Sequence, residues 1–201
     1  MDVAAHAQWA PLDLAGAYLD GGARLLQIRA KQLPSGPFLD LCDGLVRMAA
    51  PYRASIIIND RADLAVLANA AGVHVGQEDL APAEVRRLVG PNRIVGFSTH
   101  TVPQIEAATR EPISYLAVGP VFGTKTKDTV YSSVGLELVS TAARTAGAIP
   151  VVAIGGITLE TAASVLEAGA TSVAVIGDLV GQGDPQRRVA AYLQRLEQHR
   201  V

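Results

Sequence analysis

Seven short apolar runs recur along the chain, and a segment with helical periodicity follows each of them. The runs span residues 25–29, 56–60, 73–77, 94–98, 115–120, 151–156 and 173–177. Buried parallel strands are continuously apolar because helices cover both faces of the sheet, and strands that alternate with helices predict a parallel sheet. Because every run ends in polar or glycine residues, the pattern predicts an α/β fold of the (β/α)8 TIM-barrel type, whose site forms at the carboxyl ends of the strands.

The first strand of this barrel is missing or reduced in the sequence. A strand should precede the first predicted helix, residues 11–19, but Met1–Trp9 contains only Asp2-Val3-Ala4-Ala5 as a poor candidate. We expect either a chain that starts just after the position of the first strand or a distorted stub that stands in for it. A barrel that lacks one strand has two unpaired edges, which weakens it.

Size and charge limit the classes of partner. The 201 residues fit one domain with a sizeable core, so we expect a single barrel domain over residues 1–201. The formal net charge of −2 gives no strong field for nucleic acid or an anionic membrane, and neither is an expected partner. The one cysteine, Cys42, cannot form an internal disulfide, and no apolar run or signal-peptide pattern suggests a membrane or export, so we expect a cytoplasmic protein.

An amide and two cations alternate at the end of the first apolar run. Gln27, Arg29 and Lys31 are spaced by two residues, which places them on one face of a strand and its extension. Two cations that point into a barrel mouth are costly to desolvate without an anionic partner. The trio predicts a site for a diphosphate and the edge of a heteroaromatic ring; the alternative is an ion-paired rim.

Carboxylates follow the next two runs. Asp60 ends one run after Asn59, and Asp79 follows the run after it. Carboxylates from adjacent strand ends can converge on a hard cation, and Mg²⁺ often binds through one or two carboxylates together with substrate phosphates. Asp60 and Asp79 are therefore the candidate Mg²⁺ ligands. The alternatives are an ion pair of Asp60 with Arg61 and a helix cap by Asp79 before Pro82.

Two further segments suit a phosphate group. Thr124, Thr126 and Lys127 lie in a long polar loop, where hydroxyls and a lysine point charge match phosphate oxygens. Gly155-Gly156 and Gly177 follow the last two apolar runs, where barrels of this kind commonly bind phosphate through backbone N–H groups. The alternatives are a solvated loop and simple tight turns.

The remaining polar candidates are less specific. His74 lies between valines inside a run and is expected to be an interior histidine with satisfied hydrogen bonds, whereas His100 is nearer the mouth and is a weaker acid–base candidate. The arginines of the last helical segment, including Arg188, are expected on its solvated face.

Together these motifs resemble the thiamine phosphate synthase family. The resemblance covers about residues 22–180, and the ordered set is far more specific than any one motif. The motifs are Gln27-Ile28-Arg29-Ala30-Lys31, Ile58-Asn59-Asp60-Arg61, Gly72–Leu80, Gly96-Phe97-Ser98-Thr99-His100, Gly119–Phe122 with Thr124–Lys127, and Ala153-Ile154-Gly155-Gly156-Ile157.

The resemblance implies a TIM barrel and a transferase. The reaction it implies joins the diphosphate ester of 4-amino-5-hydroxymethyl-2-methylpyrimidine to a thiazole phosphate, and it yields thiamine phosphate and diphosphate. Small molecules are then the only partners implied, and Mg²⁺ is the implied cofactor. The 4-amino group can feed electrons to the methylene carbon, so a dissociative path without a nucleophilic side chain is expected.

The resemblance also assigns roles to residues. Asp60 and Asp79 hold Mg²⁺, and Arg29, Lys31, Ser98 and Lys127 assist the departing diphosphate. The residues that bind the two substrates are Gln27, Arg29, Lys31, Asn59, Ser98, Thr124, Thr126, Lys127, Gly156, Ile176 and Gly177. Family members commonly have serine where this chain has Gly177, so one hydroxyl contact to phosphate is lost there.

Two rival functions stay open at this point. A thiazole tautomerase-like isomerase has the same barrel but needs neither a diphosphate nor a metal, and the Gln27, Arg29 and Lys31 trio with the acidic pair argues against it. A non-catalytic paralogue that binds a phosphate ligand is the second rival, and the reduced first strand keeps it open.

Overall fold

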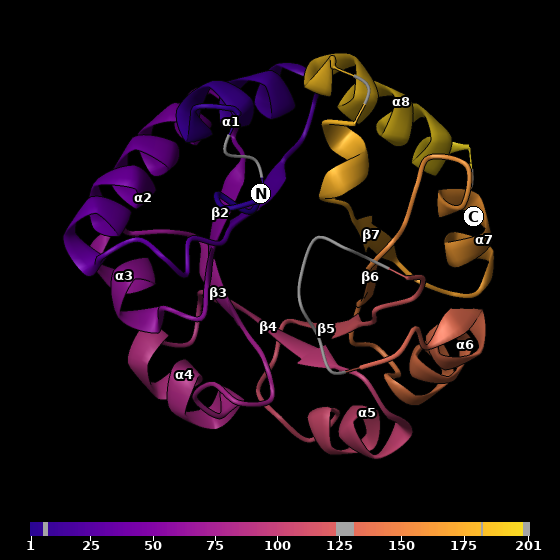
Figure 1. Cartoon of the computed structure of the whole chain (residues 1–201). Coiled ribbons are helices and arrows are strands. Elements are labelled where there is room, and N and C mark those ends of the chain that lie inside the picture. The colour runs from indigo at the N-terminus through magenta and orange to yellow at the C-terminus, as the bar shows by residue number, and fades with distance from the viewer. Residues whose placement is uncertain (6–7, 124–130, 182, 199–201) are drawn as a thin grey trace.

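The computed structural model describes residues 1–5, 8–123, 131–181 and 183–198, and within them seven parallel strands form one curled sheet inside a ring of helices (Figure 1). The strands are β1 (Leu25–Ile28), β2 (Ser55–Asn59), β3 (Gly72–Val75), β4 (Ile94–Thr99), β5 (Tyr115–Val118), β6 (Val151–Ile154) and β7 (Ser172–Ala174). The α-helices are α1 (Pro11–Asp20), α2 (Ser35–Ala49), α3 (Ala62–Leu67), α4 (Pro82–Val89), α5 (Val102–Ala108), α6 (Gly135–Thr145), α7 (Ala162–Glu167) and α8 (Pro185–Glu197). Two 3₁₀ turns, η1 (Ala50–Tyr52) and η2 (Gly177–Leu179), complete the described elements.

The strands pair in chain order, β1 to β7, which confirms the predicted parallel α/β barrel. Each helix buries an apolar stripe against this sheet. In α2, for example, Phe38, Cys42, Leu45 and Ala49 are buried at the spacing of successive helical turns. The helices also close the ring, because α8 packs against α1. Gly21 permits this approach, since a Cβ there would lie 2.5 Å from the carbonyl oxygen of Gln186.

A stub replaces the first strand, as one of the two sequence-based alternatives predicted. Asp2 forms an isolated parallel bridge with Arg29. The amide of Val3 donates to the Arg29 carbonyl (2.9 Å), and the Arg29 amide donates to the Met1 carbonyl (2.9 Å). The terminal amine of Met1 donates to the Gln27 carbonyl (2.5 Å). In the part of the chain that the structure describes, the stub therefore pairs with the carboxyl end of β1.

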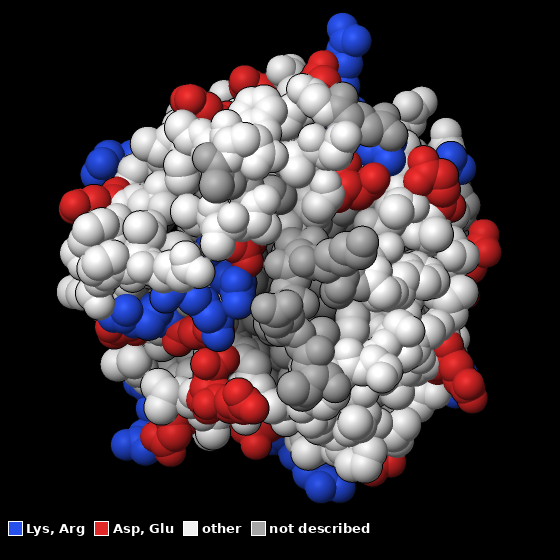
Figure 2. Space-filling view, in the orientation of Figure 1, with Lys and Arg blue, Asp and Glu red and all other residues white. Residues whose placement is uncertain are grey.

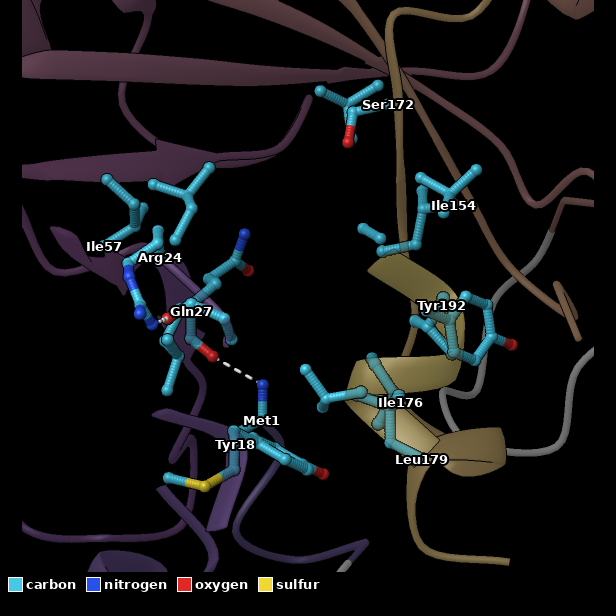
Figure 3. Close-up of a pocket in the computed structure, with 18 of the residues that line it drawn as sticks. Met1, Tyr18, Arg24, Gln27, Ile57, Ile154, Ser172, Ile176, Leu179 and Tyr192 are labelled. Carbon is cyan, nitrogen blue, oxygen red and sulfur yellow. Dashed lines mark hydrogen bonds between the residues drawn. The ribbon is translucent and has the colours of Figure 1, made fainter. Parts of the chain in front are cut away.

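Beyond the stub, β1 and β7 do not pair with each other in the part of the chain that is described. A cavity of about 320 Å³ opens between them (Figure 3), and its lining includes Leu25, Gln27, Val173, Ile176 and Leu193. Leu25 is 54% exposed although it lies in a strand. The unpaired gap between β1 and β7, which we call the seam, leaves apolar surface of the barrel interior open to water. Such exposure is expected of a barrel whose first strand is reduced.

Three local predictions differ from the structure. β4 ends at Thr99, one residue beyond the predicted run 94–98, and the Thr99 hydroxyl donates to the Ala117 carbonyl (2.9 Å) in β5. β7 ends at Ala174, because the chain then turns into η2. The expectation that Arg188 is solvated is wrong: its side chain is only 11% exposed and pairs with Asp178, because η2 packs against α8. None of the described helices is long and apolar enough to cross a membrane.

The seam and the buried Met1 amine predict how an added N-terminal strand would change the stability of the protein and its dependence on pH. Burial lowers the pKa of the Met1 amine from 8.0 to about 6, so the unfolded chain binds more protons between these values and stability rises as the pH rises from 6 to 8. A strand of alternating apolar residues fused before Met1 would replace this amine by an amide and fill the seam. We expect the melting temperature to rise by about 5 °C or more and the rise in stability from pH 6 to 8 to disappear.

The control is a glycine–serine extension of equal length, which removes the titrating amine but buries no apolar surface. Thermal unfolding followed by circular dichroism at several pH values separates the two effects. An apolar extension no more stable than the glycine–serine one would contradict the reading of the seam as an empty strand position.

Candidate active site

The two candidate metal ligands meet at the carboxyl ends of β2 and β3. Asp60 follows Asn59, the last residue of β2, and its amide donates to the His74 carbonyl (2.8 Å) in β3. Its backbone φ of 62° lies in the left-handed region, so the chain turns sharply there. The Asp60 carboxylate lies 3.0 Å from the Lys31 ammonium, and the Asp79 carboxyl group is near enough to raise the pKa of Asp60.

Both alternative roles for these carboxylates fail. Arg61 pairs with Asp63 (2.6 Å) and not with Asp60. The N-cap of α4 is Ala81, and Asp79 instead accepts a hydrogen bond from the Gly76 amide (2.8 Å) in its own loop. The structure therefore places the two carboxylates near each other, and their role as metal ligands stays a prediction.

The acidic pair is electrostatically unfavourable as it stands. Burial raises the pKa of the Asp60 carboxyl group, the nearby Asp79 raises it further, and Lys31 opposes both effects. The described residues bring no third His, Cys, Asp or Glu side chain to complete a cage around a metal. Two carboxylates are a donor set that suits Mg²⁺, which often binds one or two carboxylates together with waters and substrate phosphates. A bound divalent cation would relieve the repulsion that raises this pKa.

A buried carboxylate in the N-terminal stub fixes Arg29. Asp2 is only 3% exposed, and its carboxylate pairs with the Arg29 guanidinium. The other oxygen of Asp2 accepts a hydrogen bond from the Ala4 amide (3.0 Å), which orients the carboxylate. Arg29 is thus held at the end of β1 beside the rim. Asp2 was missed as a site residue because the sequence contains only a poor strand pattern there.

A polar network crosses the barrel interior and ends at Ser98. His74 is 7% exposed, and its Nε2 lies 2.8 Å from the Ser98 hydroxyl while its Nδ1 lies 2.8 Å from the Tyr115 hydroxyl. The prediction of an interior histidine with satisfied hydrogen bonds is confirmed. Tyr115 was missed, because a tyrosine at the start of an apolar run also fits ordinary core packing. The Ser98 carbonyl accepts from the Gln77 amide side chain (2.6 Å), which fixes this strand end.

The glycines after β6 meet the segment after β5. Gly155 and Gly156 have φ values of 98° and 65°. A Cβ on Gly156 would lie 2.5 Å from the Gly123 carbonyl oxygen, and one on Gly155 would lie 2.5 Å from Pro120. These two positions therefore require glycine for close packing. This packing agrees with the alternative that the glycines serve tight turns, and it leaves phosphate binding there as a prediction. The N–H of Phe122 donates to the Gly155 carbonyl (2.9 Å).

The other predicted residues are placed as follows. Gln27 lies in β1 and Asn59 in β2, and Ile176 and Gly177 follow β7 at the edge of the seam cavity, whose lining includes Ile176 (Figure 3). Thr124, Thr126 and Lys127 lie outside the described residues. His100 contacts the Gly119 carbonyl through Nδ1 and stacks on Tyr131 at 3.8 Å between ring centroids, which ties it to the segment after β5.

These placements gather charge of both signs at one rim. Basic and acidic side chains adjoin beside the centre of the face seen in Figure 2. The Lys31–Asp60 and Arg61–Asp63 ion pairs lie in the segments that follow β1 and β2. The lining of the seam cavity includes Gln27 and Arg29 but neither Asp60 nor Asp79. The arrangement can hold a multiply charged anion between a carboxylate-bound cation and fixed basic groups.

Comparison with known proteins agrees with this geometry. A family model described as thiamine monophosphate synthase matches residues 4–179. A thiamine-phosphate synthase of Koribacter versatilis is 47% identical over 176 residues, which is 88% of this chain and 82% of that protein. One of Roseiflexus castenholzii is 41% identical over 180 residues, 90% of this chain and 78% of that protein.

Solved structures give the same result. A thiamine phosphate pyrophosphorylase from Pyrococcus furiosus superposes with a TM-score of 0.86 at 29% identity, covering 94% of this chain and 91% of that one. A 3-hexulose-6-phosphate synthase superposes with a TM-score of 0.65 at 16% identity, covering 100% of this chain and 96% of that one, and shows the fold alone.

The raised pKa of Asp60 predicts that the charged carboxylate lowers the stability of the metal-free protein. A carboxyl group with a raised folded-state pKa favours the folded state only while it is protonated, and this contribution is lost as the pH rises through the folded pKa. We expect Asp60→Asn, which also tolerates the left-handed backbone, to raise the melting temperature at pH 7.5 by about 3 °C without metal. The gain should shrink as the pH falls into the range in which Asp60 is protonated.

Asp63→Asn is the matched control, because Arg61 lowers the pKa of the Asp63 carboxyl group. That substitution should lower the stability at pH 7.5. Differential scanning calorimetry from pH 3 to 8 measures both effects. A melting temperature for Asp60→Asn at or below that of the parent protein at pH 7.5 would refute the unfavourable charge of the pair.

Proposed function

The chain belongs to the thiamine monophosphate synthase family, and from this premise we propose how its barrel rim carries out thiamine-phosphate synthesis, a transferase reaction. The observation that carries the assignment of roles is the acidic pair of Asp60 and Asp79 held beside Lys31 at one end of the sheet. We take the substrates to be the hydroxymethylpyrimidine diphosphate and the thiazole phosphate.

The reaction exchanges one bond for another. The thiazole ring nitrogen supplies the electron pair for a new C–N bond to the pyrimidine methylene carbon. The C–O bond to the diphosphate breaks, and its electron pair leaves with the diphosphate. The products are thiamine phosphate, with a positively charged thiazolium ring, and diphosphate. Because the leaving group gains negative charge as the C–O bond breaks, catalysis needs fixed positive charge at that point.

Asp60 and Asp79 are the residues that would hold Mg²⁺. When bound there, the cation would neutralise the diphosphate charge as a Lewis acid. The two carboxylates suit this role because each comes from a different strand end, and the Gly76 amide orients one of them. The Asp60 contact with Lys31 keeps a second positive charge at the same point.

The remaining cationic groups would stabilise the leaving diphosphate directly. Arg29, held by Asp2, presents a planar donor set that matches phosphate oxygens. Lys31 and Lys127 would act as point charges, and the Ser98 hydroxyl would donate a hydrogen bond. Lys127 enters this proposal from the family motif alone, since it lies outside the described residues.

The two substrates would occupy different sides of the rim. Gln27 and Asn59 are assigned to the pyrimidine diphosphate, near the ends of β1 and β2. The thiazole phosphate is assigned to residues after β5, β6 and β7. These residues are Thr124, Thr126, Gly156, Ile176 and Gly177. At Gly177 the backbone N–H would contact the phosphate in place of the hydroxyl that family members commonly have there.

The acidic pair also weighs against the isomerase alternative, which requires no metal. We further propose that residues 1–201 act as one domain, because the strands pair in chain order and α8 returns to α1.

The assay that tests this function uses both phosphorylated precursors. Incubation with Mg²⁺ should give thiamine phosphate and diphosphate in equal amounts, and chelation of the metal should abolish the product. We expect Asp79→Ala to lower the rate by about two orders of magnitude or more, the scale seen when preorganised charge stabilisation is removed. Chromatographic detection of thiamine phosphate measures the rate.

Asp63→Ala is the control for this variant, since Asp63 is an exposed carboxylate that pairs with Arg61 away from the acidic pair. Its rate should stay close to that of the parent protein. Equal rates for Asp79→Ala and the parent protein would remove Asp79 from the mechanism, and no product from the parent protein at any metal concentration would refute the synthase function.

A further inference from the structure

We propose that a hydrogen-bonded chain through the barrel interior, Tyr115 to His74 to Ser98, turns the Ser98 hydroxyl into a hydrogen-bond donor for the departing diphosphate. His74 and Tyr115 are then positioning residues for the reaction, acting through Ser98. The inference rests on the proposed function for its role in catalysis, but the direction of the hydrogen bonds is a property of the protein itself.

The chain connects three strands across the barrel. Tyr115 begins β5, His74 lies in β3 and Ser98 lies in β4. The Tyr115 hydroxyl lies 2.8 Å from Nδ1 of His74, and the Ser98 hydroxyl lies 2.8 Å from Nε2. Both distances are those of a normal hydrogen bond.

The backbone makes room for this chain at one residue. Gly96 in β4 pairs with His74 in the sheet register. A Cβ at this position would lie 2.1 Å from the Tyr115 ring and 2.5 Å from Nδ1 of His74. Any larger residue at position 96 would therefore separate the two rings, and the glycine is required by the Tyr115–His74 contact.

The direction of the chain follows from counting protons. Burial raises the pKa of the Tyr115 hydroxyl, so this group keeps its proton at neutral pH, although Gln27 lowers the pKa. Nδ1 of His74 is the hydrogen-bond partner of this largely buried hydroxyl, and a buried O–H group without an acceptor is costly, so Tyr115 donates its one proton to Nδ1. A neutral imidazole that accepts at Nδ1 carries its hydrogen on Nε2. Nε2 then donates to the Ser98 oxygen.

This direction decides what Ser98 can offer a ligand. If the imidazole accepted at Nε2, the Ser98 proton would be spent on His74 and the oxygen would face the rim as an acceptor, which repels an anion. With Nε2 as the donor, the Ser98 proton is left to point toward an acceptor at the rim. The Ser98 side chain is partly exposed and its strand end is held by Gln77, so the hydroxyl is available there.

The tautomer is the first test and needs no substrate. Long-range ¹H–¹⁵N spectra of the full chain, labelled at histidine nitrogens, distinguish protonated from bare ring nitrogens. The His74 signals are those that disappear in His74→Gln. We expect bare Nδ1 and protonated Nε2 in the parent protein, and a loss of this preference in Tyr115→Phe. A protonated Nδ1 or a doubly protonated ring in the parent protein would overturn the inference.

The second test asks whether the chain acts through Ser98. Binding of inorganic diphosphate in the presence of Mg²⁺ is measured by calorimetry for Tyr115→Phe, Ser98→Ala and the double variant. We expect Tyr115→Phe to weaken binding by about 5-fold and Ser98→Ala by about 10-fold or more, with no further loss in the double variant. His74→Gln, whose amide can still donate to Ser98, should retain more affinity than His74→Leu.

Tyr52→Phe is the matched control, because this variant also loses one tyrosine hydrogen bond, which Tyr52 donates to Asp20 (2.6 Å) on the outer surface. It should leave diphosphate binding unchanged. Additive losses in the double variant, or equal affinities for the His74→Gln and His74→Leu variants, would mean that the network is only structural and would overturn the inference.

Turnover separates this inference from the proposed function. In an active enzyme Tyr115→Phe should lower kcat or raise KM for the pyrimidine diphosphate and leave KM for the thiazole phosphate unchanged. An active parent protein with an unaffected Tyr115→Phe variant would overturn the inference and leave the synthase function standing. An inactive parent protein with the expected tautomer and diphosphate binding would refute the synthase function and leave the hydrogen-bond chain in place.

Discussion

The contact between the carboxylates of Asp60 and Asp79 is unfavourable on its own, and the surrounding fold is arranged to hold it. Parallel pairing of β2 with β3 brings the two strand ends together, and the left-handed turn at Asp60 directs one carboxylate toward the other. Lys31 and the Gly76 amide compensate part of the charge. A folded protein keeps such repulsion only where the rest of the structure outweighs it, which is why strained charge marks functional sites.

The N-terminal stub shows which part of a strand this site needs. Within the described residues the helix ring closes through α1 and α8, whereas β1 and β7 do not pair. The stub keeps its pairing with the end of β1 and the ion pair of Asp2 with Arg29. The end of β1 to which we assign anion binding is therefore anchored by backbone hydrogen bonds and one ion pair.

The interior of this barrel contains a hydrogen-bonded polar network in addition to apolar side chains. Buried polar groups are costly unless each is hydrogen-bonded, and the His74 network meets that requirement through Tyr115 and Ser98. The absence of a side chain at Gly96 leaves the space that the Tyr115 and His74 rings occupy. This network links the interior ends of Tyr115 in β5 and His74 in β3 to Ser98 in β4, and in our proposal these two interior groups set the orientation of the Ser98 hydroxyl.

The sequence by itself determined the parallel barrel, the weakness of its first strand and the position of Asp60 and Asp79 after adjacent strands. These follow from local patterns, because apolar runs define strands and the topology brings their carboxyl ends together. Only the tertiary structure decided the pairing of Asp2 with Arg29, the burial of Arg188 and the contact of Tyr115 with His74. Those contacts join residues far apart in the chain, and their partners depend on strand register and helix packing, which no local pattern records.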